Sequence, residues 1–497
     1  MRGSLSDPLP QAARGRALLA LIAQYGIGAA IPAVVSLLSA AIFTRALTAA
    51  AYGRATLAVN SQALLAGLGT LWLQQAVLRY IPGENNPESA RTLKRVVVSA
   101  TITICASTVA GGLFVIGVIL GSVEATWQGL LLPTLLAAAV TGFSNVTFAI
   151  LQAEFRAGWH AAIRVVGALL RFGAGLLLVL VMRVGEKGIV WALFLASLLM
   201  IPLQWRLSGC TQTLRFSPSG TRGATRLQDL ARYGVPIAGW LLAAELLYGA
   251  DRYIIQLTRG SAEVGMYAAS YDVVAGAVQA LSGPVLLAVH PYLIRTLGQL
   301  SRRQLGLQLS TLLRWYSLFG SLLCGFVLLF GESAVRMLVG SEFASGAAIV
   351  PLVFFGNVVW ILGYCLHKPI ELAQRSEVLF GLGIGAAFLN ITLNCVFIPL
   401  YGYVAGAVTT VIAYSAYVAG VISYLRWKLE IRLSLGPSIR VCITNLAGCL
   451  GVKVVSERAA QAVGRVGASA VAGALFLMMV LIASAVAMRW VAERRAV

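Results

Sequence analysis

The sequence carries little charge for its length. Only 11% of its 497 residues are Asp, Glu, Lys or Arg, whereas these four types make up about 25% of an average soluble protein. Its mean hydropathy is +0.84. The scarcity of charge excludes a soluble globular domain, and the abundance of apolar residues excludes an intrinsically disordered chain.

Residues for metal binding or covalent catalysis are also scarce. The three histidines, at positions 160, 290 and 367, lie far apart, and the seven cysteines contain neither a CxxC pair nor a metal-ligand spacing. We interpret the cysteines as small packing residues. No phosphate-binding GxxxxGK(S/T) loop and no nucleophile elbow occurs. The sequence therefore predicts no metal ion, no cofactor, no enzymatic activity and no ATP-driven pump.

Apolar residues dominate instead. They make up 59% of the chain, or about 293 residues. Because a helix needs about 20 of them to cross a bilayer, the composition allows roughly fourteen crossings. Long apolar runs with short polar breaks predict the same number of helices, over 17–44, 55–78, 96–120, 128–153, 161–182, 189–205, 233–257, 266–294, 311–331, 345–366, 377–400, 403–425, 437–455 and 466–488.

We therefore predict an all-α polytopic membrane protein. The expected regions are a tail, a lobe of six helices, a flexible linker, a second lobe of six helices and a final helix pair, over 1–16, 17–205, 206–232, 233–425 and 426–497. The shortest connection between two predicted helices lies at Pro399-Leu400-Tyr401-Gly402-Tyr403, where Pro and Gly predict a tight turn.

The positive charges alternate with the predicted helices. Of the 38 Lys and Arg residues, 27 are assigned to the two terminal tails and the loops on the same side and ten to the opposite side; Arg171, well inside the fifth predicted helix, is left over. The positive-inside rule then predicts that both termini are cytoplasmic. Because the cations form no continuous stripe, the net charge of +20 does not indicate a nucleic-acid partner.

Two stretches of the chain are alike. Tyr25-Gly26, Thr44-Arg45 and Tyr52-Gly53 correspond to Tyr233-Gly234, Asp251-Arg252 and Val264-Gly265, with an offset of 208 residues at the Tyr-Gly pairs and 207 at the arginines. Six helices separate the repeats, so both lobes enter the membrane in the same direction and are related by a pseudo-two-fold axis along its normal. A ligand site is expected where the first, second, seventh and eighth helices face one another.

The same residues resemble a known family. Tyr233-Gly234-Val235-Pro236, Gly249-Ala250-Asp251-Arg252-Tyr253 and Val264-Gly265-Met266-Tyr267 are similar to the signature of Wzx-type oligosaccharide flippases, which belong to the multidrug/oligosaccharidyl-lipid/polysaccharide superfamily. The resemblance implies a protein of the bacterial inner membrane. It would flip undecaprenyl-pyrophosphate-linked oligosaccharide, a repeat unit of O-antigen, capsule or exopolysaccharide, by alternating access around a cationic cavity. It further implies a polysaccharide polymerase and chain-length proteins as partners.

Three arginines are candidates for binding the pyrophosphate. A cation inside a membrane helix is expensive and is therefore a functional candidate, and the planar guanidinium of Arg171 suits bidentate phosphate binding. Arg45 and Arg252 occupy matching repeat positions and would supply one cation from each lobe. The alternatives are a structural ion pair or snorkelling for Arg171, an interfacial anchor for Arg45, and a local pair with Asp251 for Arg252.

Three carboxylates complete the candidate site. Asp251 belongs to the family-like motif, Glu245 lies near the middle of the seventh predicted helix, and Asp272 lies near the start of the eighth. Glu245 and Asp272 could exchange a coupling proton, but we favour their being counter-ions of Arg171 or Arg252.

Three other functions stay open. A cation-coupled drug antiporter of the same superfamily would need an acid inside the first lobe, and 17–205 offers only Glu154, at a helix end. A lipid II flippase would share fourteen helices and a cationic cavity. A membrane polymerase or ligase usually carries a large outer loop, and none here exceeds about fifteen residues by the predicted boundaries.

Overall fold

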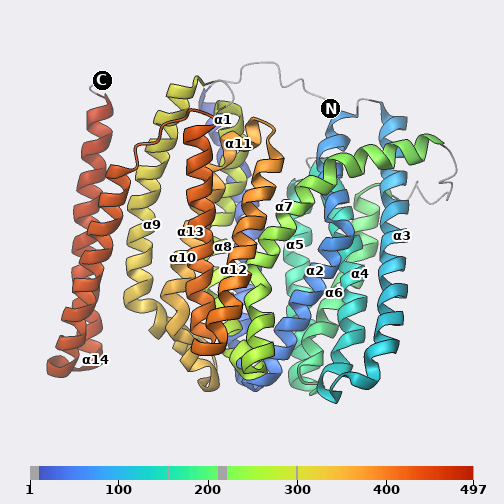
Figure 1. Cartoon of the computed structure of the whole chain (residues 1–497), viewed down its shortest axis with the longest axis horizontal. Helices are drawn as coiled ribbons and strands as arrows, with labels where there is room; N and C mark the ends of the chain where they lie inside the picture. The colour runs from blue at the N-terminus through green and yellow to red at the C-terminus, as the bar shows by residue number, and fades with distance from the viewer. Residues whose placement is uncertain (1–10, 85, 155–156, 211–220, 298–299, 496–497) are drawn as a thin grey trace.

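The computed structural model describes residues 11–84, 86–154, 157–210, 221–297 and 300–495, all of them in helices or short connections (Figure 1). The helices are α1 (Gln11–Ala46), α2 (Ala49–Tyr80), α3 (Pro87–Ile119), α4 (Ala125–Ala153), α5 (Ala157–Leu176), α6 (Lys187–Leu207), α7 (Thr221–Arg259), α8 (Ser261–Leu297), α9 (Arg302–Leu338), α10 (Val350–Leu366), α11 (Lys368–Leu372), α12 (Ser376–Tyr401), α13 (Tyr403–Trp427) and α14 (Gly436–Arg495). Short helical segments are η1 (Ile81–Gly83), η2 (Leu120–Ser122), the π-helical η3 (Leu177–Val181) and η5 (Ser341–Ile349).

Helix α14 folds back on itself and supplies two crossings. The Ser456 hydroxyl donates to the Ala468 carbonyl at 3.2 Å, although twelve residues of straight helix would separate them by about 18 Å. The two arms contain separate apolar stretches, Gly436–Ala460 and Gly467–Ser484. Because α11 has only five residues, the long helices make fourteen crossings, and the predicted number is confirmed.

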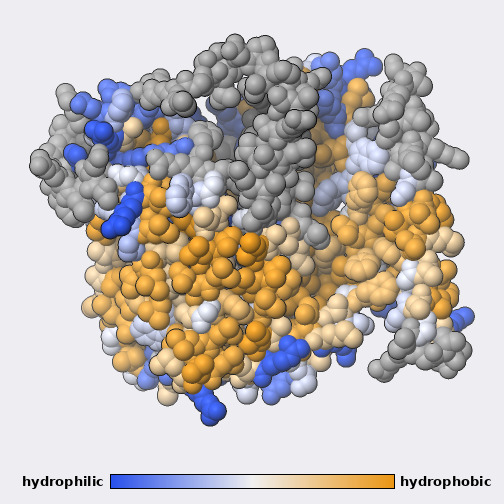
Figure 2. Space-filling view, turned by 180° about the vertical axis from the view of Figure 1, so that it is seen from behind, coloured by the Kyte–Doolittle hydropathy of each residue, from blue (hydrophilic) through white to orange (hydrophobic). Residues whose placement is uncertain are grey.

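The described residues form a membrane protein with many crossings. Eleven stretches are long and apolar enough to span a bilayer, and a broad apolar band lies between two hydrophilic ends (Figure 2). Of the two central helices, α2 is not among the eleven, and the side chains of α8 are described only as far as residue 280. Both helices carry polar side chains such as Asn60, Gln74 and Asp272 along their length, as helices that face an internal site would.

The two predicted lobes are visible in the packing. Helix α1 packs on α5, α2 on α4, α4 on α6 and α5 on α6; six helices later, α7 packs on α12, α8 on α10, α10 on α13 and α12 on α13. Between the lobes, α1 packs on α8 while α2 packs on α7 and α8. The predicted interface of four helices is therefore confirmed, and α14 lies outside it, against α9 (Figure 1).

The two ends of this bundle differ. At one end lie the start of α1, the starts of α3 and α9 and the C-terminal end of α14, and we call it the terminal end (Figure 1). At the opposite end, the far end, lie the connections α1–α2 and α7–α8 together with η5. The terminal end is the one that the charge count predicts to be cytoplasmic.

Some boundaries differ from the sequence prediction. Helix α7 begins at Thr221, so the second part of the expected linker 206–232 is helical, whereas its Ser217-Pro218-Ser219-Gly220 stretch and residues 1–10 of the expected tail lie outside the described residues. The side chains of 11–27 and 281–297, including Tyr25 and His290, also lie outside them. The predicted turn at Gly402 is confirmed: its φ of 68° separates α12 from α13.

Candidate substrate site

The family-like motif in α7 forms a buried ion pair with α8. The Arg252 guanidinium, 2% exposed, donates from Nη2 to Asp272 Oδ1 at 2.7 Å. It also lies 5.6 Å from the ring centre of Tyr248 and 5.3 Å from that of Tyr271, at cation–π distance. Tyr52 of α2 lies within electrostatic range of both charges. Asp272 is thus the counter-ion of Arg252, whose Nε has no hydrogen-bond partner in the described residues.

Asp251 is also fully occupied. Its carboxylate is buried and accepts the Arg252 backbone N–H at 2.8 Å and the Tyr267 hydroxyl of α8. The Asp251 Cβ approaches Gly406 of α13. Since it joins α7, α8 and α13, Asp251 stabilises the second lobe from within.

Arg45 lies at the far end and binds backbone carbonyls. Its Nη1 donates to the carbonyls of Ala41 and Leu338, both at 2.6 Å, and its Nη2 to that of Met337 at 2.8 Å. The last carbonyls of a helix carry partial negative charge, so Arg45 anchors α1 to the C-terminal end of α9. It lies one residue before the end of α1, whereas Arg252 lies seven before the end of α7. The structure therefore does not bring these arginines together as a matched pair.

Further hydrogen bonds close the far end between the lobes. The backbone N–H of Gly340 donates to Thr44 Oγ1 at 3.0 Å, and the backbone N–H of Ala49 donates to Glu342 Oε2 at 2.9 Å. Both bonds join the first two helices to the segment around η5. In this conformation the far end is sealed.

Arg171 is the candidate cation that stays available. It is exposed, and no hydrogen bond or ion pair joins it to another side chain in the described part of the chain. Ala168 and Gly175, three residues before it and four after it, are buried, and a Cβ on Gly175 would lie 2.7 Å from the Phe43 ring of α1. Because residues three or four apart share a helix face, Arg171 lies on the side of α5 that faces α1.

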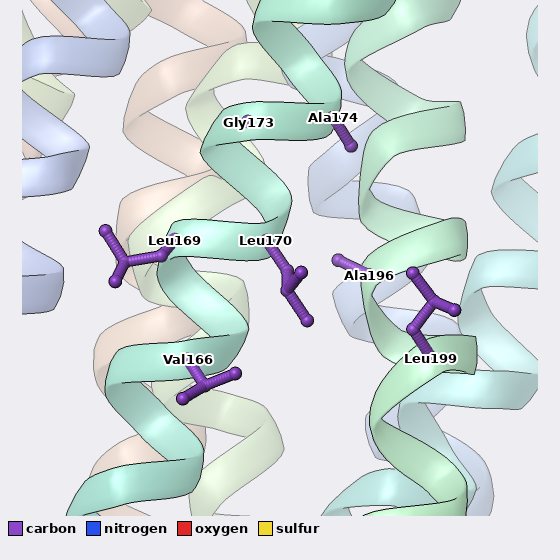
Figure 3. Close-up of a pocket in the computed structure, with 7 residues that line it drawn as sticks. All are labelled: Val166, Leu169, Leu170, Gly173, Ala174, Ala196 and Leu199. Carbon is purple, nitrogen blue, oxygen red and sulfur yellow. The ribbon is translucent and has the colours of Figure 1, made fainter.

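The other side of α5 carries an apolar groove. Leu170 and Ala174 point from α5 toward α6 (Figure 3). The groove has a volume of about 360 Å³ and is lined by Val166, Leu169, Leu170, Gly173, Ala174, Ala196 and Leu199. Arg171 is absent from this lining, so its charge and the groove occupy different faces of the helix.

Glu245 is the available carboxylate. It is exposed near the middle of α7, and no ion pair reaches it within the described residues. Leu242, three residues earlier, approaches Gly67 of α2, and Gly249, four residues later, approaches Asn60 of α2. Glu245 therefore lies on the face of α7 that meets α2, at the interface between the lobes.

Two buried polar groups were not predicted. Asn394 Nδ2 donates to Asn390 Oδ1 at 3.0 Å, and Thr409 donates to Asn394, which joins α12 to α13. His367 Nδ1 lies 2.8 Å from the Tyr417 hydroxyl. The sequence did contain a signal for the first group, because Asn390 and Asn394 lie four residues apart within an apolar run.

Comparisons with known proteins agree with this architecture. Residues 42–348 match the model of a family described as polysaccharide biosynthesis protein. The chain belongs to the polysaccharide biosynthesis protein family. No curated protein sequence is significantly similar to it. The match runs from the end of α1 into η5 and so includes the buried motif of α7 and α8.

Solved structures with the same fold are flippases and transporters. The family member superposes on "Lipid II flippase MurJ, inward closed conformation" with a TM-score of 0.72 and 13% identity, over 94% of this chain and 99% of that one. It superposes on an inward-facing multidrug resistance MATE family transporter of the MOP superfamily with a TM-score of 0.65 and 15% identity, over 81% and 98%. Superposition on an outward-facing MATE family transporter gives a TM-score of 0.55 and 15% identity, over 82% of this chain and 95% of that one. This protein is therefore a membrane protein that shares the fold of these flippases and transporters.

Proposed function

We propose that this protein flips an undecaprenyl-pyrophosphate-linked oligosaccharide across the bacterial inner membrane. The observation that carries the proposal is Arg171, an exposed guanidinium inside a membrane helix that has no partner in the described residues. Such a group favours an anionic ligand because an unpaired charge at membrane depth is costly. Membership in a polysaccharide biosynthesis family supports an oligosaccharide cargo.

We infer that transport proceeds by alternating access. The lobes meet along α1, α2, α7 and α8, and the far end is sealed by Arg45, Thr44 and Ala49. Better superposition on an inward-facing than on an outward-facing transporter supports the same state. The cargo would enter from the terminal end, and breaking the far-end contacts would release it on the other side.

The test is complementation of a flippase-deficient bacterium. Arg171→Ala is expected to abolish surface polysaccharide while the protein inserts in the membrane at the wild-type level. Arg91→Ala, which removes an exposed cation of α3, is the matched control and should support full output. Full polysaccharide output from Arg171→Ala would refute the phosphate-binding role.

A drug antiporter is the alternative that the MATE family neighbours raise. Glu245 is an available acid, but it lies in the second lobe, and Glu154 of the first lobe is paired with Lys94. We therefore favour the anionic cargo. Resistance of the host to cationic dyes, measured with and without the protein, separates the two functions, because only an antiporter would raise it.

A further inference from the structure

The start of α14 and the first half of α9 run side by side in fixed register. The backbone N–H of Ser434 donates to Ser310 Oγ at 2.9 Å, Cys442 Sγ lies 3.8 Å from the Ser317 carbonyl, and Asn445 Nδ2 donates to Ser321 Oγ at 2.8 Å. The residue numbers in each pair differ by 124 or 125. This register places Arg314 level with Ser438, in the first turn of α14.

Both of these residues have polar atoms without partners. Ser438 is 3% exposed, and its hydroxyl has no hydrogen-bond partner in the described residues. The same holds for the buried Nε of Arg314, and no acceptor among those residues binds its two terminal nitrogens. Unpaired buried polar groups are costly. An acceptor from outside the chain would therefore be stabilised here, beside the free N–H groups that begin α14.

The surroundings are strongly positive. Glu430 is already paired with Arg302. The other charged residues with described side chains at the starts of α9 and α14 and in the α13–α14 connection are cations, namely Arg303, Arg314, Lys428, Arg432 and Arg440. The corner lies at the terminal end, where a membrane helix meets the lipid headgroups. Clustered Lys and Arg at such a level attract anionic lipid.

An apolar groove begins one helical turn deeper. Trp315, next to Arg314, packs with Val441 against Leu318, Leu322 and Ala483. The groove has a volume of about 530 Å³ and is lined by Leu318, Phe319, Leu322, Leu323, Phe326, Phe476, Val480, Ala483 and Ser484. Its lining has the chemistry of an acyl-chain site, directly below an anion site.

We propose that an anionic phospholipid is bound between α9 and α14, with its phosphodiester at Arg314 and one acyl chain in the groove. The substrate lipid is not the occupant, because α14 packs chiefly on α9 and lies away from α1, α2, α7 and α8 (Figure 1). The bound lipid fastens the C-terminal helix pair to the second lobe. It is a resident component rather than cargo.

The test is lipid binding to the purified full chain by native mass spectrometry. Wild type is expected to retain dioleoyl phosphatidylglycerol in preference to dioleoyl phosphatidylcholine. Arg314→Gln should weaken phosphatidylglycerol binding about five-fold without changing phosphatidylcholine binding. Arg336→Gln, at the other end of α9 and ion-paired with Glu332, is the control and should bind as wild type. Unchanged binding by Arg314→Gln, or an equal loss in both variants, would overturn the proposal.

Further measurements identify the ligand and control for a variant that does not fold. Inorganic phosphate or dihexanoyl phosphatidylglycerol that raised the melting temperature as much as the long-chain lipid would overturn the acyl-chain part. Displacement of phosphatidylglycerol by equimolar undecaprenyl phosphate would assign the groove to the cargo and also overturn the proposal. If Arg314→Gln does not elute as a single species, Arg314→Lys takes its place. Its affinity for phosphatidylglycerol should fall about two-fold, because lysine keeps the charge but not the planar fork of the guanidinium. An unchanged affinity would refute the site. Arg171→Ala should bind this lipid normally, so the result is independent of the proposed function.

Discussion

Gly53 and Gly265 face each other across the lobe interface in a reciprocal contact. A Cβ on Gly53 would lie 2.0 Å from the Ser261 carbonyl oxygen and 2.8 Å from the Gly265 nitrogen, and a Cβ on Gly265 would lie 1.9 Å from the Ala49 carbonyl oxygen. Each glycine is the fifth residue of its helix, α2 or α8. The backbones at the far end therefore approach as closely as helices can, and they do so symmetrically.

Gly53→Ala should weaken closure of the far end. No real Cβ tolerates a carbonyl oxygen at 2.0 Å, so the two helices must separate. Spin labels at the exposed Val184 and Leu257, one on each lobe, should show a longer distance than in wild type. Gly111→Ala in α3, where a Cβ would meet nothing within 4 Å, should leave the distance unchanged. A wild-type distance in both variants would show that the contact does not hold the far end closed.

Removing Arg252 should destabilise the protein more than removing the pair. Arg252→Met leaves the carboxylates of Asp272 and Asp251 without their cation, and loss of one member of a buried pair costs about 3–5 kcal/mol. Arg252→Met with Asp272→Leu should recover part of that loss. Thermal unfolding of the purified variants measures the non-additivity. Equal stability of Arg252→Met and the double variant would contradict the prediction, since it would mean that the unpaired Asp272 carboxylate carries no cost.

Glu245→Gln should separate a coupling role from a structural one. The side chain is exposed and has no ion-pair partner among the described residues, so its neutralisation should leave the melting temperature within about 1 °C of wild type. If Glu245 exchanges a coupling ion, translocation in proteoliposomes should lose its response to an imposed proton or sodium gradient. A full response in the variant would assign coupling to another group.

Gly402→Ala should destabilise the α12–α13 turn. Gly402 has φ 68° and ψ −161°, a conformation that side chains disfavour, and a Cβ would lie 2.9 Å from Glu263 Oε2. The expected loss is about 1–3 kcal/mol, visible as a lower melting temperature. Gly385→Ala, inside α12 with open space around it, should be neutral or slightly stabilising. If the two variants melted alike, the turn would tolerate a side chain.

The sequence predicted the helices well because their signal is local. Apolar runs and turn residues such as Gly402 depend on neighbours in the chain, and the fourteen crossings follow from them. The folded-back α14 was also predictable, since the polar Ser456–Arg465 stretch separates its two apolar arms.

The candidate site was harder to predict because it depends on partners distant in sequence. Arg45, Arg171 and Arg252 look equivalent as cations near or within helices. The structure differentiates them: α9 carbonyls bind Arg45, Asp272 binds Arg252, and Arg171 stays available. The repeat was misleading at the arginines because eight residues separate Arg45 from Gly53 but thirteen separate Arg252 from Gly265, so the matched cations lie at different depths.

The C-terminal helix pair makes the two sides of the molecule unequal. Helices α3 and α9 correspond under the pseudo-two-fold axis, yet α14 covers α9, while the apolar stretch of α3 has no buried residue in its most apolar window. Lipids that diffuse in the plane of the membrane therefore meet an open flank on one side and a covered flank on the other. A long-tailed cargo would have a preferred direction of lateral approach, set by the helix pair and not by the lobes themselves.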